Sequence, residues 1–250
     1  LGWIYYHLST IYSKNYKYVE QINSAKKTIE FISSANGEDY IGLSSDYHLL
    51  AEAYMRQGIL GEADNFLNKA FYILNSNDYT NFEYEYFELV YTFAELAIAE
   101  QQDKKALDAF NEISNYFENN DRGFPYLEGQ TYFYLADYYL TQKDFISAET
   151  FINKAEKVLE PYQSLSFYYD GFTEIKIDQL FLSGKNDELN DFLNSYKKYF
   201  ESTNSRENIN TTSLLNYNYL ISKFDYLKNN PKKFIKEITN NLNILEQNNI

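Results

Sequence analysis

The chain has 250 residues, of which 44% are hydrophobic, with nine Gly, three Pro and no Cys, and its formal net charge is −14. This composition supports a substantial core and long helices with few breaks, so we expect an all-α protein. The absence of Cys excludes disulfides, zinc-thiolate sites and thiol catalysis. The acidic charge disfavours direct binding to nucleic acid, and no stretch approaches the roughly 18 apolar residues of a membrane span.

Apolar periodicity and turn residues predict six helix pairs. In chain order they span residues 2–15 and 17–33, 40–57 and 60–75, 81–101 and 103–118, 126–142 and 144–159, 165–183 and 186–200, and 210–228 and 231–247. Gly58 and Gly184 fall at the tight turn inside a pair, where a left-handed residue can end the first helix. The pairs predict a single helical array over residues 1–250. Because the chain begins with Leu1 rather than Met, we expect a fragment or a processed form.

A pattern of large and small residues recurs along these pairs. It reads Tyr47, Leu50, Ala51, Tyr54, Ala63 and Ala70 in one place, and Tyr132, Leu135, Ala136, Tyr139, Ala148 and Ala155 in another. The small residue of the second helix recurs at Ala63, Ala106 and Ala148, and more weakly at Leu189, which gives a period of about 42 residues. One helix pair cannot bury its apolar face alone, so the pairs must stack on one another.

This order of residues resembles the tetratricopeptide repeat (TPR). The resemblance is clear over residues 45–160, and it is degenerate in the first pair, 2–33, and in the C-terminal pairs, 165–247. The family repeat has 34 residues, so this longer period looks like the stretched repeats of bacterial regulators that carry a DNA-binding or signalling domain. The resemblance implies a right-handed α-solenoid of about six pairs whose first helices line a concave face that binds peptides or proteins.

In such an array three columns of the first helices face the groove. The position five residues after the first aromatic is acidic in four pairs: Glu52, Glu95, Asp137 and Asp178. The position eight residues after it is apolar: Met55, Ile98, Leu140 and Phe181. The position one residue after it holds His48, Tyr91, Phe133 and Glu174.

Two interpretations of these columns stay open. The columns form a groove for a segment with Lys or Arg and bulky apolar side chains, or the acids are solvated or paired with nearby Lys and Arg. For the apolar column we favour packing between pairs. Chaperone-binding members of the family clamp a carboxylate with Lys and Asn on these positions, so the acids here predict that this activity is absent.

We therefore expect a peptide- or protein-binding interaction or sensor domain, as the regulatory part of a larger signalling or transcription-regulating protein. The alternative is a scaffold for homo- or hetero-oligomer assembly; a third possibility is an enzyme or small-molecule receptor that uses the Tyr-rich groove. No catalytic motif is present, so we expect no enzyme activity and no cofactor. His48 and Glu52 lie four residues apart, but two ligands are weak evidence for a metal. We favour the cytoplasm, although the lack of Cys does not separate it from the periplasm.

Overall fold

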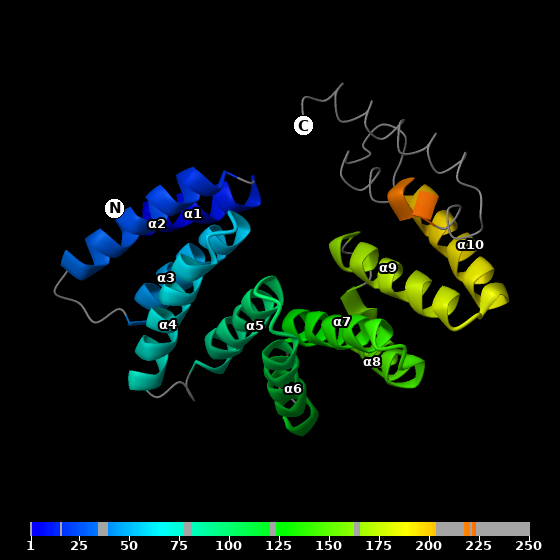
Figure 1. Ribbon diagram of the computed structural model, residues 1–250. Coiled ribbons are helices and arrows are strands. Elements are labelled where there is room, and N and C mark those ends of the chain that lie inside the picture. Colours follow the sequence, from blue (N-terminus) through cyan, green and yellow to red (C-terminus); the bar gives the residue numbers. More distant parts are fainter. Residues whose placement is uncertain are drawn as a thin grey trace. The chain divides into compact units, whose positions relative to one another are not determined.

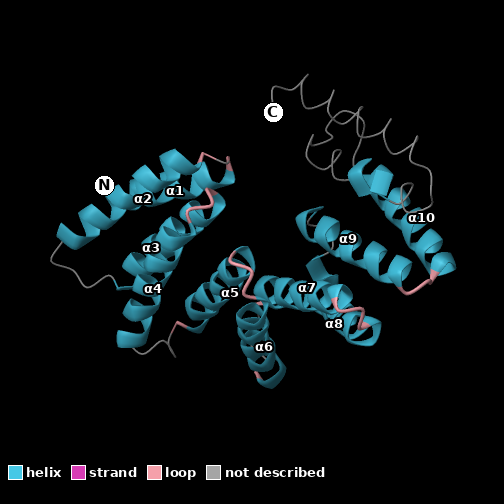
Figure 2. Cartoon of the chain, viewed as in Figure 1, coloured by secondary structure: helices cyan, strands magenta, loops and turns pink. Residues whose placement is uncertain are grey.

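A computed structural model describes residues 2–15, 17–34, 40–77, 82–120, 124–162, 166–203, 218–220 and 222–223. The helices named in Figure 1 are α1 (Gly2–Lys14), α2 (Tyr18–Ser34), α3 (Tyr40–Arg56), α4 (Leu60–Ser76), α5 (Glu83–Ala99), α6 (Asp103–Asn119), α7 (Pro125–Thr141), α8 (Phe145–Leu159), α9 (Ser166–Leu182) and α10 (Asn186–Thr203). A 3-10 turn (Glu160–Tyr162) follows α8. Figure 2 shows helices and loops, and the described residues contain no strand.

The all-α prediction is confirmed, and each predicted helix of the first five pairs matches an observed helix to within three residues at both ends. Of the sixth predicted pair, residues 210–228 and 231–247, only 218–220 and 222–223 lie among the described residues, and these are helical.

The chain divides into two compact units, Leu1–Leu127 (unit 1) and Glu128–Ile250 (unit 2), with the division in the first turn of α7. In unit 1 each helix from α1 to α6 packs against the next along the chain. In unit 2, α8 packs against α9, and α9 packs against α10.

The recurring small and apolar residues form the core of each unit. Unit 1 buries Leu50, Ala51, Ala63, Leu67 and Ala70, and unit 2 buries Leu135, Ala136, Ala148, Ile152 and Ala155 at the corresponding places. Small side chains let paired helices approach closely, while the large ones fill the space between the helices. The residues of the repeat pattern therefore form the buried core of each unit.

Tyrosine and lysine complete this core in the same way in both units. Tyr47 and Tyr54 of α3 contact Phe66 of α4 at ring distances of 5.9 and 5.5 Å, and Lys69 Nζ lies 4.6 Å from the centre of the Phe66 ring. In unit 2 the same arrangement is built from Tyr132, Tyr139, Phe151 and Lys154. The rings bury apolar area, and the lysine covers the aromatic face with its charge still in water.

The turns inside four pairs, α3–α4, α5–α6, α7–α8 and α9–α10, use a left-handed residue at the same place. Gly58 and Gly184 have φ of 74°, as predicted, while Gln101 and Lys143 have φ of 62° and 60°. The next residue donates its backbone N–H to the carbonyl five residues earlier, as from Ile59 to Tyr54 at 2.9 Å. The same bond runs in the other three turns, from Gln102 to Ala97, Asp144 to Tyr139 and Lys185 to Leu180. This pattern is the Schellman helix end, which satisfies the last carbonyls of the first helix.

Candidate functional site

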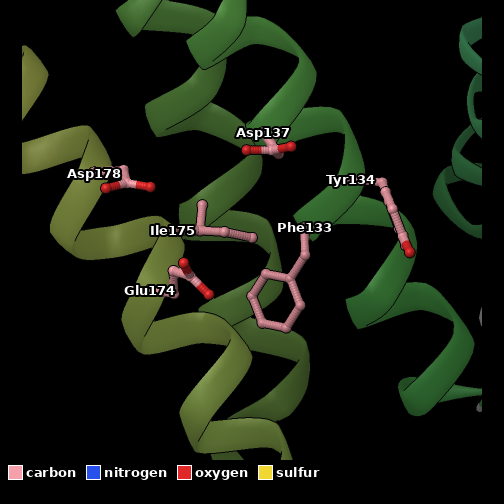
Figure 3. A pocket seen from close by; sticks show the side chains of 6 residues that line it. All are labelled: Phe133, Tyr134, Asp137, Glu174, Ile175 and Asp178. Carbon is pink, nitrogen blue, oxygen red and sulfur yellow. The ribbon is translucent and has the colours of Figure 1, made fainter. Parts of the chain in front are cut away.

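An open pocket of about 340 Å³ lies between α7 and α9 in unit 2. We call it the acidic pocket; it is lined by Phe133, Tyr134, Asp137, Glu174, Ile175 and Asp178. Phe133 and Asp137 lie four residues apart on α7, as do Glu174 and Asp178 on α9, so each pair shares one face of its helix. Figure 3 shows Glu174 and Asp178 on one side and Asp137 on the other, with Ile175 and Phe133 between the two helices.

A lysine from the helical residues 222–223 pairs with the two acids of α9 that line the pocket. Lys223 Nζ lies 2.9 Å from Glu174 Oε1 and 2.9 Å from Asp178 Oδ2. The hydroxyl of Tyr219 also donates to Glu174 Oε1, at 3.2 Å. The lysine side chain is only 21% exposed, so water screens these ion pairs less than it screens pairs at an open surface.

The surroundings of the acidic pocket make the ionised form of its Asp side chains less favourable. Desolvation, followed by the charges of Asp178 and Glu174, raises the pKa of Asp137, although its side chain is exposed at the pocket surface. Desolvation also raises the pKa of Asp178, against the opposing effect of Lys223. Desolvation acts to lower the pKa of Lys223, but its hydrogen bonds to the two acids outweigh this and raise it. The single positive charge of Lys223 does not balance the three carboxylates of the pocket. A further cation would reduce the repulsion that remains between them.

Unit 1 holds its own acidic cluster on α3 and α5. His48 Nε2 lies 2.7 Å from Thr92 Oγ1, which joins the two helices. Desolvation raises the pKa of Glu88, while a hydrogen bond with Tyr84 and the nearby His48 act to lower it. Glu52 adds a negative charge that also acts to raise the pKa of Glu88. Glu95 lies three residues after Thr92 on α5 and is partly buried.

The remaining predicted groove residues occupy mixed environments. Met55 packs against the core cluster of unit 1, and Leu140 is buried in unit 2. Tyr91 meets Phe110 of α6 edge-on, with ring centres 5.6 Å apart. Ile98 is exposed. The structure thus brings Phe133, Asp137, Glu174 and Asp178 together, and it places Met55, Leu140 and Tyr91 against neighbouring apolar side chains.

Sequence reasoning missed Lys223 and Tyr219 in the acidic pocket and Glu88 in unit 1. The repeat pattern is lost in the sixth pair, so no column assigned a role to Lys223. One signal was present: Tyr219 stands 45 residues after Glu174, and Lys223 stands 45 residues after Asp178. Glu88 stands seven residues before Glu95, two helical turns along the same face of α5.

The described residues contain neither a metal-binding cluster nor a membrane-spanning helix. No group of three or more His, Cys, Asp or Glu side chains there is arranged to hold a metal ion. Within the same residues, no helix is both long enough and apolar enough to cross a membrane.

Comparison with known proteins identifies the fold. No family model matches the chain, and no curated protein matches it. Among solved structures, BtubC (BKLC) from P. vanneervenii is 15% identical with a TM-score of 0.60, over 81% of this chain and 83% of that one. A single-residue variant of a Podosopora anserina protein, described as a kinesin light chain with nearly identical TPR-like repeats, is 14% identical with a TM-score of 0.61, over 80% and 94%.

These likenesses and the buried repeat pattern agree. The described helices have the antiparallel pairing, the small residues at helix contacts and the left-handed turns of stacked helical repeats. The chain therefore has an all-α fold of the TPR-like repeat type.

Proposed function

We propose that this chain is a protein-interaction module that holds a basic segment of a partner protein in an acidic groove, as the regulatory part of a larger signalling or transcription-regulating protein. One observation carries the proposal: the acidic pocket combines three carboxylates with the apolar and aromatic side chains of Phe133, Tyr134 and Ile175. A segment that presents Lys or Arg beside a bulky apolar residue matches both parts of the pocket.

The chain's own ion pairs support this chemistry. Lys223 shows that the carboxylates of α9 accept an ammonium group at 2.9 Å. Asp137 lies across the pocket, where desolvation, followed by repulsion from the charges of Asp178 and Glu174, raises its pKa. An incoming cation removes part of this repulsion, while Phe133 and Ile175 contribute apolar contact area.

The net charge of −14 favours the same class of partner. An acidic surface raises the rate of encounter with basic proteins, and this effect weakens when salt screens the charges. We therefore expect binding of a basic segment to weaken as ionic strength rises.

The test is titration calorimetry with the blocked peptide acetyl-Gly-Ser-Leu-Lys-Phe-Ser-Gly-amide, which places one lysine between two apolar residues. Asp137→Lys reverses one pocket charge and should weaken binding by about tenfold or more, because a close pair of unlike charges becomes a pair of like charges. The control Asp191→Lys makes the same charge change at an exposed position of α10 outside the pocket and should bind like the parent protein. Equal affinity in Asp137→Lys and the parent would reject the acidic pocket as the binding site.

A second candidate is self-assembly through the first helix pair. Trp3, Ile4 and Ile11 of α1 and Val19 of α2 are exposed, by 74%, 51%, 52% and 62%. Large exposed apolar residues that gather on one element are typical of an interaction surface. Light scattering at several concentrations tests this candidate: a strict monomer at every concentration removes it, and a dimer that dissociates in Trp3→Glu supports it.

A further inference from the structure

A lysine lies against the last acid of the acidic column. Glu52, Glu95, Asp137 and Asp178 occupy one position of the first helices in four consecutive pairs. Lys223, in the helical residues 222–223, lies against the end of that column, where it contacts Asp178 and Glu174 together. Because Glu174 and Asp178 lie one helical turn apart, a single ammonium group reaches both carboxylates.

Lys223 reduces the number of pocket carboxylates that are available to a cation of a partner. Lys223 donates hydrogen bonds to Glu174 and Asp178, the two pocket acids of α9, and its side chain is largely covered. Asp137 lies on the opposite helix, and Figure 3 shows its carboxylate facing the space between α7 and α9. The acids of α9 therefore already have a cation, whereas Asp137 remains exposed to an incoming one.

We infer that Lys223 is a specificity-determining residue: it occupies Glu174 and Asp178, so the acidic pocket has only Asp137 left for a cationic side chain of the partner segment. A second cationic side chain on that segment therefore adds little affinity. The inference rests on the proposed function, because it assumes that the pocket binds a basic segment. Its physical basis is that removing Lys223 uncovers two neighbouring carboxylates, which a second cation of the partner can then occupy.

The experiment compares two classes of peptide on the parent protein and on Lys223→Met. The one-lysine peptide is the probe given above, and the two-lysine peptides carry a second lysine three or four residues after the first. The parent protein should bind both classes with affinities within about threefold of each other, because only one carboxylate is left for the peptide. Lys223→Met should favour the two-lysine peptides by about tenfold or more, because the acids of α9 become available.

Lys185→Met is the matched control. Lys185 Nζ lies 2.7 Å from Glu149 Oε1, in the same unit but outside the acidic pocket. This variant loses an ion pair and a positive charge, as Lys223→Met does, so it corrects for the change in net charge. It should keep the parent's ratio of affinities.

A second measurement works on the parent protein and does not depend on how Lys223→Met folds. Carbon-13 labelling of the side-chain carboxylates should show the Asp137 signal moving on addition of the one-lysine peptide, and the Glu174 signal moving much less.

Lys223→Gln, which keeps a polar side chain of similar length, should repeat the tenfold preference of Lys223→Met.

The outcomes separate the two proposals. If the one-lysine peptide binds through Asp137 but neither Lys223 variant prefers two lysines, the pocket is a binding site and the role of Lys223 is wrong. A Glu174 signal that moves as much as that of Asp137 leads to the same conclusion. If no peptide binds the parent, or if Asp137→Lys binds unchanged, the proposed function fails and this inference fails with it.

Discussion

At the residue scale, Gly129 shows how one missing methyl group permits close helix packing. It lies in α7, and a Cβ built there would meet Cδ1 and Cγ of Leu159 at 2.6 and 2.7 Å. Glycine inside a helix costs about 1 kcal/mol relative to alanine. The glycine is explained by the side chain of Leu159, which occupies the space that any larger residue at 129 would need.

We therefore predict that Gly129→Ala lowers the free energy of unfolding by up to about 2 kcal/mol, because overpacking a buried site costs about 1–3 kcal/mol and the gain in helix propensity offsets only about 1 kcal/mol of it. Urea denaturation monitored by circular dichroism measures the change. Gly61→Ala is the control, since a Cβ at that position in α4 meets nothing within 4 Å. It should be neutral or stabilising by up to about 1 kcal/mol. An equal gain in both variants would mean that Leu159 moves aside freely.

At the scale of the helix pair, the four left-handed turns differ in whether the residue with positive φ adopts that conformation without steric cost. Gly58 and Gly184 adopt positive φ without cost, whereas the Cβ atoms of Gln101 and Lys143 crowd the following carbonyl. The backbone bonds are nevertheless the same in all four turns. The geometry of the pair, rather than the residue, thus imposes the left-handed conformation.

We predict that Lys143→Gly stabilises the protein by about 0.5–1 kcal/mol, since relief of the left-handed strain exceeds the entropy that glycine loses on folding. Gly184→Ala should destabilise it by about 1 kcal/mol for the converse reason. Lys157→Gly, at an exposed position inside α8, is the control and should cost about 1 kcal/mol. Thermal unfolding of the three variants checks these signs. If Lys143→Gly proved as destabilising as Lys157→Gly, strain at this turn would not be a significant cost.

The helix pairs were predictable because their signals are local. Apolar periodicity and turn residues depend on neighbours within a few residues, so the helices of the first five pairs follow from the sequence to within three residues. The acidic pocket depends on contacts over 45 and 49 residues between Lys223 and the acids of α9, and no local pattern encodes these contacts. The packing of Tyr91 on Phe110 likewise depends on the rotation of α5, which is set by the neighbouring helix.

At the scale of the whole molecule, charge and burial act together on stability. The chain carries a net charge of −14, and desolvation is the largest cause of a raised pKa at Glu88 in unit 1 and at Glu128, Asp137 and Asp178 in unit 2. An acid whose pKa is raised by folding binds more protons in the folded state than in the unfolded state. The free energy of unfolding therefore falls as pH rises from the unfolded value, near 4, through the folded value.

We predict that the thermal midpoint, measured by circular dichroism at constant ionic strength, is higher at about pH 5 than at about pH 7.5. Below about pH 4 it should fall again, because hydrogen bonds from Ser147 lower the pKa of Asp144, whose stabilising effect is lost on protonation.

Salt separates the two causes of the neutral-pH slope: about 0.5 M NaCl screens the repulsion between distant surface charges but leaves the desolvation of Glu88 and Asp137 in place. A slope that persists in salt and flattens in the double variant Glu88→Gln with Asp137→Asn would assign it to these carboxyls. A slope that disappears in salt would assign it to the net charge instead, and a midpoint that rises between pH 5 and 7.5 would contradict both causes.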